Sequence, residues 1–222
     1  MTEYSGEAAQ VQIVLRPTGH PLPLGFLGLA VGTLALSSLQ LGWVAPTEGR
    51  VVAVTALAFT APLQLLASVL GFQSRDTVAG TGMGILSGTW AVIGLVLFTA
   101  RPGSTSDALG VVPIGAGAAL AAPALAATGK LVAAAVLGTA SVRFGVTGVA
   151  QLTGSTGWED TAGMIGLLLA VLALYAATAF ALEDVQQRAV LPLFRRDRGR
   201  TYEPRRGRAD DLSRSPGVRA QL

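Results

Sequence analysis

Six apolar runs, each close to 20 residues long, constrain what this chain can fold into. A helix needs roughly 20 apolar residues to cross the ~30 Å hydrocarbon core of a bilayer. Only 13% of the residues are charged, about half the share in a soluble domain. We therefore predict an all-α membrane protein whose six transmembrane helices form a bundle. The runs are Leu22–Leu41, Val51–Leu70, Val78–Thr99, Ala108–Ala127, Leu131–Leu152 and Gly157–Leu182.

The boundary between the fourth and fifth runs is inferred from the maximum length of a membrane-spanning helix. From Ala108 to Val142 the only charged side chain is Lys130. A single helix over this stretch would be about 52 Å long at 1.5 Å per residue, well beyond the thickness of the core. We therefore expect a turn at residues 127–130, which include Gly129.

Positive charge predicts the orientation, because cytoplasmic segments of membrane proteins are enriched in Lys and Arg. Both termini are expected on the cytoplasmic side of the cell membrane. Residues 1–19 then form an N-terminal tail, residues 20–194 the transmembrane domain, and residues 195–222 a disordered basic tail near anionic lipid. No nucleic-acid binding is expected, because aromatic side chains are not interleaved with the basic ones. The arginines after Leu193 are at positions 195, 196, 198, 200, 205, 206, 208, 214 and 219.

Nothing in the sequence predicts an enzyme, a cofactor or a metal site. The chain has one histidine, His20, and no cysteine, so thiolate chemistry is excluded. Glu159 and Asp160 are adjacent in sequence, as are Glu183 and Asp184, and adjacent residues do not share a helix face. We expect Glu159 and Asp160 to cap the last helix, whose positive dipole end favours carboxylates.

Proline and glycine in the first run indicate how that helix begins and packs. Pro21 and Pro23 fit the first turn of a helix, where the missing N–H would be unpaired anyway. Gly28 and Gly32 are four residues apart, a spacing that lets helix backbones approach closely in lipid. Gly80, Gly84 and Gly88 repeat the same spacing in the third run.

Three separated segments resemble the acetate uptake transporter family, the acetate–succinate permeases. They are HPLPLGFLGL from residue 20, QLLASVLGFQSRDTVAGTGMGILSGTW from residue 64, and YAATAFALEDVQQRAVLPLF from residue 175. The first segment resembles the signature that opens the family's first helix, with His20 in place of its Asn. The matching signature residues are Pro21, Pro23, Leu24 and Gly25.

The resemblance implies a six-helix protomer with its own central pore, assembled as a homohexamer. It also implies an apolar constriction formed by one side chain each from the first, third and fifth helices. By register these are Leu29, Leu86 and Val142. Relatives typically carry Phe at the first position and Tyr at the second, so leucine at both predicts a less aromatic pore.

Polar side chains inside the apolar runs are candidates for the substrate pathway. An apolar constriction strips water from a passing solute, so flanking groups must offer hydrogen bonds. Gln64, Thr81 and Tyr175 are placed to do so. Arg143 lies about 20 Å along its helix from Lys130. It either extends to the outer headgroups, pairs with Glu159 or Asp160, or faces an outer vestibule and attracts carboxylates.

The sequence thus predicts a channel or proton-coupled transporter for acetate and other short carboxylates, with succinate as a further candidate. Two alternatives stay open. One is a six-helix channel for amides or urea. The other is a membrane scaffold without transport activity, whose arginine-rich tail recruits a partner.

Overall fold

The computed structural model describes residues 20–186, 188 and 190–194, and this part of the chain is helical. Six helices are long and apolar enough to cross a membrane, which confirms the predicted fold class. The second span, Pro46–Gln73, is assembled from a 3₁₀ turn (Pro46–Glu48), α2, a π-helical turn (Ala56–Thr60) and α3. The α-helices are α1 Leu22–Gln40, α2 Gly49–Thr55, α3 Ala61–Gln73, α4 Thr77–Thr99, α5 Asp107–Ala126, α6 Leu131–Thr153 and α7 Thr156–Gln186.

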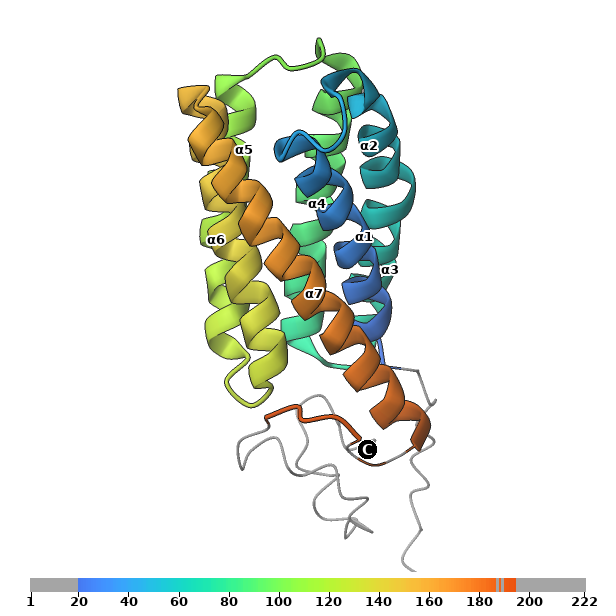
Figure 1. The fold of residues 1–222 in the computed structure, drawn as a ribbon. Helices are drawn as coiled ribbons and strands as arrows, with labels where there is room; N and C mark the ends of the chain where they lie inside the picture. Colours follow the sequence, from blue (N-terminus) through green and yellow to red (C-terminus); the bar gives the residue numbers. More distant parts are fainter. Residues whose placement is uncertain (1–19, 187, 189, 195–222) are drawn as a thin grey trace, which may run out of the picture.

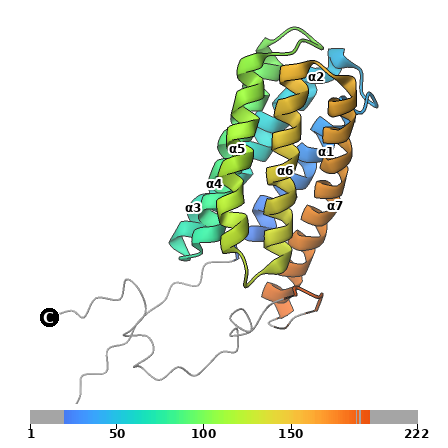
Figure 2. The same ribbon diagram turned by 90° about the vertical axis from the view of Figure 1, so that its left-hand side faces the viewer.

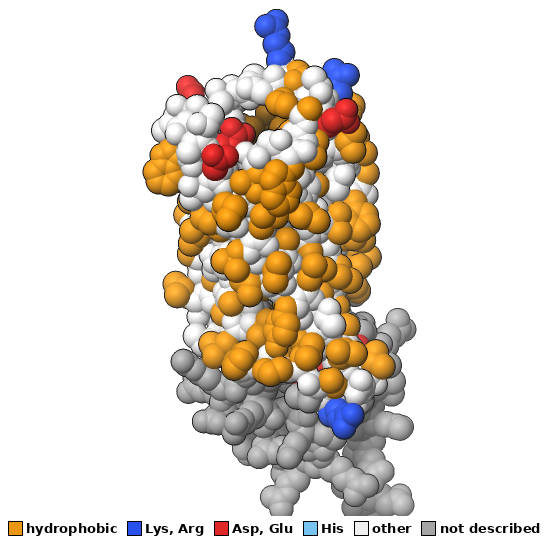
Figure 3. All heavy atoms as spheres, viewed as in Figure 1, with side chains coloured by type: hydrophobic (Ala, Val, Ile, Leu, Met, Phe, Trp, Pro, Cys, Tyr) orange, Lys and Arg blue, Asp and Glu red, His pale blue; other side chains and the backbone are white. Residues whose placement is uncertain are grey.

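The helices pack side by side, and α7 crosses the bundle obliquely (Figures 1 and 2). The start of α1 and the end of α7 lie at one end of the bundle, which we call the termini end. The loops after α1 and α4 lie at the other, distal end. Hydrophobic side chains cover the middle of the outer surface, and charged side chains gather toward its ends (Figure 3). This distribution suits a protein whose middle is surrounded by lipid.

The turn between α5 and α6 lies where chain length predicted it. Helix α5 ends at Ala126 and α6 begins at Leu131. Pro113 and Pro123 lie inside α5 without ending it, because neighbouring helices and local adjustments accommodate proline in membrane helices. At the distal end, Glu159 lies in the first turn of α7, near the positive end of the helix dipole. Capping of α7 by Glu159 and Asp160 stays a prediction.

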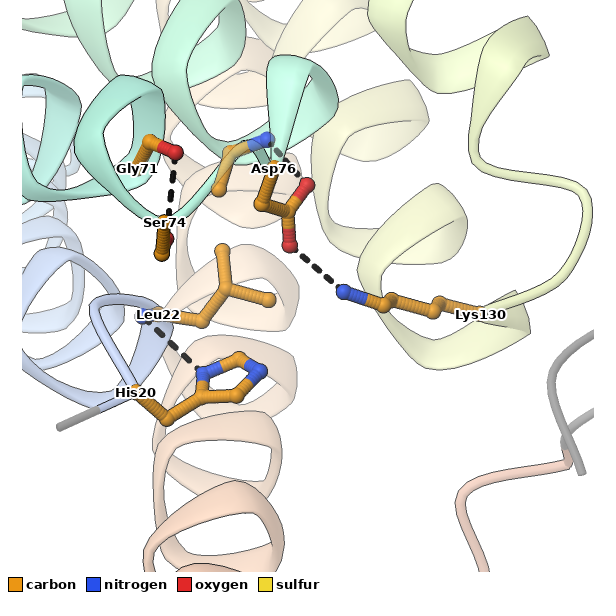
Figure 4. A network of polar contacts seen from close by, with 7 residues as sticks. His20, Leu22, Gly71, Ser74, Asp76 and Lys130 are labelled. Carbon is orange, nitrogen blue, oxygen red and sulfur yellow. Dashed lines mark hydrogen bonds and ion pairs between the residues drawn. The ribbon is translucent and has the colours of Figure 1, made fainter. Parts of the chain in front are cut away.

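Side-chain contacts at the termini end fix the starts of α1 and α4 (Figure 4). His20 Nδ1 accepts a hydrogen bond from the Leu22 N–H at 3.3 Å, and its ring stacks on Phe180 at 5.1 Å. Asp76 caps α4 by accepting from the Ala79 N–H at 3.0 Å. The same carboxylate pairs with Lys130 at 2.5 Å and so joins the start of α4 to the start of α6.

Asp76 keeps its negative charge despite partial burial. Desolvation by burial would raise the pKa of this carboxyl, but the hydrogen bonds from Lys130 and Ala79 and the positive charge of Lys130 lower it. The net shift of the Asp76 pKa is downward, so the ion pair with Lys130 persists well into the acid range.

Glycines let several helix backbones meet directly. A Cβ on Gly71 would lie 2.7 Å from the Gly80 backbone nitrogen, so α3 and α4 touch there. A Cβ on Gly117 would lie 2.6 Å from the Ser141 carbonyl oxygen, and Ser141 Oγ donates to the Gly117 carbonyl across the same contact at 2.6 Å. Gly88 differs, since it has no neighbour within 4 Å of its would-be Cβ.

Candidate functional site

The interior faces of α4 and α6 are in a fixed register. A Cβ on Gly82 would lie 3.0 Å from Leu137, and two turns along, the rings of Trp90 and Phe144 are 5.8 Å apart. Leu86 lies between Gly82 and Trp90 on the same face of α4, because residues four apart share a face. It therefore faces α6 at the level of Ala140.

Helix α1 brings Leu29 to the same level. Gly25 of α1 packs against Met83 of α4, and Leu29 lies one turn further along. Leu29, Leu86 and Ala140 are each 0% exposed and belong to one buried apolar cluster. We call these three residues the neck. Helix α7 packs against α1 here with small, buried side chains, which are Ala173, Ala176 and Ala177.

Val142 does not belong to the neck, so this expectation needs correction. Its side chain is 57% exposed, and two residues along an α-helix turn a side chain by about 200° from Ala140. Val142 shares the outward face of α6 with Gly138 and Gly145, which have no neighbour within 4 Å of a would-be Cβ. Ala140 is the residue of α6 that lies level with Leu86 on the buried side of the helix.

Two further expected pathway residues also point elsewhere. Thr81 lies on the face of α4 opposite Leu86, on the same side as the exposed Gly88, and is only half-buried. The Tyr175 hydroxyl donates to the Pro192 carbonyl at 2.8 Å and holds the segment that follows α7. The Tyr175 hydroxyl is therefore bound to backbone and not directed at the neck.

Arg143 lies one turn from the neck toward the distal end and is 0% exposed. Its Nη2 donates to Ser37 Oγ at 3.4 Å and to Gln40 Oε1 at 3.3 Å. The guanidinium carbon is 5.7 Å from the ring centres of both Trp90 and Phe144. A Cβ on Gly166 of α7 would lie 2.6 Å from Arg143 Nε, so glycine leaves room for the guanidinium.

These contacts decide among the three interpretations of Arg143 in part. The side chain does not extend to the headgroup region, because it is completely buried. In the described part of the chain it forms no ion pair with Glu159 or Asp160, since its hydrogen-bond partners are the neutral Ser37 and Gln40. It faces the interior of the bundle, as the vestibule hypothesis requires.

Several buried polar atoms have no hydrogen-bond partner among the described residues. Gln64 is 0% exposed, and both its amide oxygen and its amide nitrogen are unpaired. Other buried hydroxyls bond to backbone instead, as Ser87 Oγ does to the Ala61 carbonyl at 2.8 Å. Unpaired buried polar groups are costly and rare in proteins, so these atoms are candidates for contact with a solute. The remaining unpaired atoms are Thr33 Oγ1, Thr60 Oγ1, Trp90 Nε1, Arg143 Nε and Arg143 Nη1.

Gln64 and Arg143 were predicted from the sequence as pathway residues, whereas the polar residues of α1 near Arg143 were not. Thr33, Ser37 and Gln40 all lie within the first apolar run at spacings of three and four residues. That spacing is the signal for one polar face in an otherwise apolar helix. Trp90 gave no comparable signal, because a tryptophan in an apolar run is ordinarily a packing residue.

The bundle combines six membrane-length helices, an apolar neck and polar groups buried beside it, which defines a multi-pass membrane protein of the transport class. The chain belongs to the GPR1/FUN34/yaaH family, whose profile matches residues 6–195. This membership confirms the resemblance to the acetate uptake transporters. The solved structure of the bacterial acetate channel SatP is similar in fold, with a TM-score of 0.71 and 23% sequence identity, over 80% of this chain and 99% of that one. No match was found among curated proteins.

Proposed function

We propose that this protein is a channel or proton-coupled transporter for acetate and other short carboxylates, including succinate. The solute passes through the interior of the protomer, across the neck. The family match and the shared fold with an acetate channel support this function. The observation that carries it is the set of unpaired polar atoms buried around the neck, because a pathway filled with water or solute supplies their missing partners.

The chemistry of the neck favours small amphipathic acids. A bare carboxylate that enters an apolar constriction loses hydration at a cost of several kcal/mol, whereas the protonated acid loses far less. Gln64 offers a carbonyl acceptor and an amide donor, so it suits either form of a carboxyl group. Leucine and alanine make the neck apolar, which suits the acyl part of such an acid.

The membrane setting extends this proposal. The protein lies in the cell membrane with both termini in the cytoplasm, so the distal end of the bundle faces outward. We also propose a homohexamer. The outward faces of α4, α5 and α6 carry Gly88, Gly115 and Gly138, each with open space around its would-be Cβ, and small residues permit close helix contacts in lipid. Cross-linking in membranes should give a ladder that ends at six, and a clean monomer both in membranes and in mild detergent excludes the hexamer.

Solute uptake into proteoliposomes tests the function directly. Radiolabelled acetate, urea and butyramide are supplied to vesicles that contain the purified protein, with protein-free vesicles as the control. Saturable acetate entry without urea entry is expected. Entry of urea or butyramide without acetate entry identifies an amide channel instead, and no flux of any solute favours the scaffold.

A further inference from the structure

We propose that Arg143 is the centre of a built binding site for one ionised carboxylate on the distal side of the neck. This inference rests on the proposed function and goes beyond it, because it assigns the charge state of the substrate that is captured. The site consists of Arg143, Ser37, Gln40, Trp90 and Thr33. It holds the anion next to the neck.

The unbalanced charge of the guanidinium is the first argument. Arginine is effectively always protonated, and an isolated buried charge is strongly unfavourable unless it is paired. The side chains that Arg143 contacts are neutral, namely Ser37, Gln40 and the two aromatic rings. A bound anion supplies the charge that these groups lack.

The free donors are the second argument. Among the described residues, only Nη2 of the guanidinium has partners, and both hydrogen bonds that it makes are long, at 3.3 and 3.4 Å. Nε and Nη1 have no partner in the described part of the chain, and the same holds for the indole N–H of Trp90. Trp90 lies against the guanidinium, with its ring centre 5.7 Å from the Arg143 carbon. A group that only accepts hydrogen bonds therefore fits best, and a carboxylate is such a group.

The distal end of the bundle is the nearer surface to the site, because Gln40 is the last residue of α1. Gln40 and Thr147 are 8% and 6% exposed, and they hydrogen-bond to each other at 3.5 Å on the distal side of Arg143. Figure 3 shows a hollow in the surface at this end of the bundle, bordered by acidic side chains. Thr33 lies on the opposite side, one turn of α1 from Ser37 toward the neck, with its hydroxyl unpaired. An anion on Arg143 is thus next to the neck.

A carboxylate is favoured over a simple halide by the shape of the donors. The guanidinium is planar and offers several N–H groups, which match the two oxygens of a carboxylate. The apolar neck next to the site receives a methyl group or a short acyl chain. Chloride has no apolar part to place there.

Uptake kinetics of three variants test the site. Arg143→Gln removes the charge, Arg143→Lys keeps the charge without the planar donor array, and Arg50→Gln removes an exposed arginine at the same end of the bundle as a matched control. A charged hydrogen bond contributes about 1.5–3 kcal/mol, so Arg143→Gln should raise the half-saturating acetate concentration at least about tenfold. Arg143→Lys should be intermediate, and Arg50→Gln should stay close to the wild type.

The pH dependence of the wild type identifies the captured species without any mutation. If the anion binds, the half-saturating concentration stays constant with pH when it is expressed as ionised acetate. In detergent, acetate should raise the thermal unfolding temperature of the wild type and of Arg50→Gln but not of Arg143→Gln. Acetamide, which has the same shape without the charge, should raise none of them.

The outcomes separate the two proposals. Absence of acetate uptake by the wild type refutes the proposed function. If Arg143→Gln takes up acetate with an unchanged half-saturating concentration, the anion site is refuted but the proposed function is not. The anion site is also refuted if the half-saturating concentration of the wild type is constant with pH when expressed as neutral acetic acid and not when expressed as acetate. Chloride that protects and competes as well as acetate refutes the carboxylate assignment. If Arg143→Gln does not insert into membranes, the wild-type pH series and Arg143→Lys decide the question.

Discussion

Replacement of Ala140 by phenylalanine is the sharpest test of the neck. Ala140 is 0% exposed and faces Leu86 across the interior, so a benzyl group added there has to be fitted into packed space. Overpacking of this kind costs about 1–3 kcal/mol. If the same free energy is added to the barrier for solute passage, acetate flux falls about 5- to 150-fold, because each 1.36 kcal/mol changes a rate tenfold. Longer acids should lose more than acetate.

The assay is radiolabelled acetate uptake per inserted molecule, compared between Ala140→Phe and Val142→Phe. The second variant adds the same aromatic ring two residues away, on the 57% exposed outward face of α6, and should leave flux nearly unchanged. Ala140→Val serves as a graded, smaller perturbation if the phenylalanine variant inserts poorly. Slow flux in Val142→Phe together with normal flux in Ala140→Phe would refute the assignment of Ala140 to the neck.

Three further predictions concern packing, pH and the tail. Gly117→Ala should lower the free energy of unfolding by about 1–2 kcal/mol, because its methyl group meets the Ser141 carbonyl. Gly115→Ala, with open space around the added methyl group, should not destabilise the protein. Equal unfolding temperatures of the two variants contradict the predicted clash at Gly117. Asp76→Asn keeps the helix cap but loses the ion pair with Lys130, which contributes about 1 kcal/mol or less. The Asp76 pKa is lowered from its ordinary 3.8, so the stabilisation by the ion pair is complete above this value and disappears as the pH falls through the lowered pKa. Wild type and variant should therefore differ in unfolding temperature at pH 7 and have the same unfolding temperature in acid. Truncation after Phe194 should preserve acetate flux per inserted molecule, and loss of flux at normal insertion would favour a regulatory or scaffolding role for residues 195–222, which lie outside the described part of the chain.

The positions of the helices could be predicted from the sequence, but the side of each helix that points into the bundle could not. The expected run Val78–Thr99 corresponds to α4, Thr77–Thr99, and Leu131–Leu152 corresponds to α6, Leu131–Thr153. Span boundaries are predictable because the polar breaks and the length needed to cross the hydrocarbon core both act on them. The second span differs more, since Pro46 and the residues after it already belong to the helix.

The side of a membrane helix that points into the bundle is harder to predict, because such a helix is apolar on both its interior and its lipid-facing sides. Val142 and Ala140 are both apolar, and nothing in the residues themselves separates them. Contact with Leu137 and Phe144 of α6 is what fixes the register against α4. For Arg143 the sequence left three interpretations open. A charge inside an apolar run needs water or polar partners, and the structure supplies Ser37 and Gln40.

The π-helical turn at Ala56–Thr60 has a consequence for how this chain tolerates changes in length. A π turn accommodates one extra residue within an α-helix, so the residues before and after it keep their facing toward the same neighbours. Deleting one residue here, such as the 43% exposed Phe59, removes the extra residue of the turn, so we expect Ala53 and Gln64 to stay directed inward. A deletion in the middle of α4 or α6 instead rotates one half of the helix by about 100° relative to the other. The second span is therefore where the bundle can lose a residue and keep its interior.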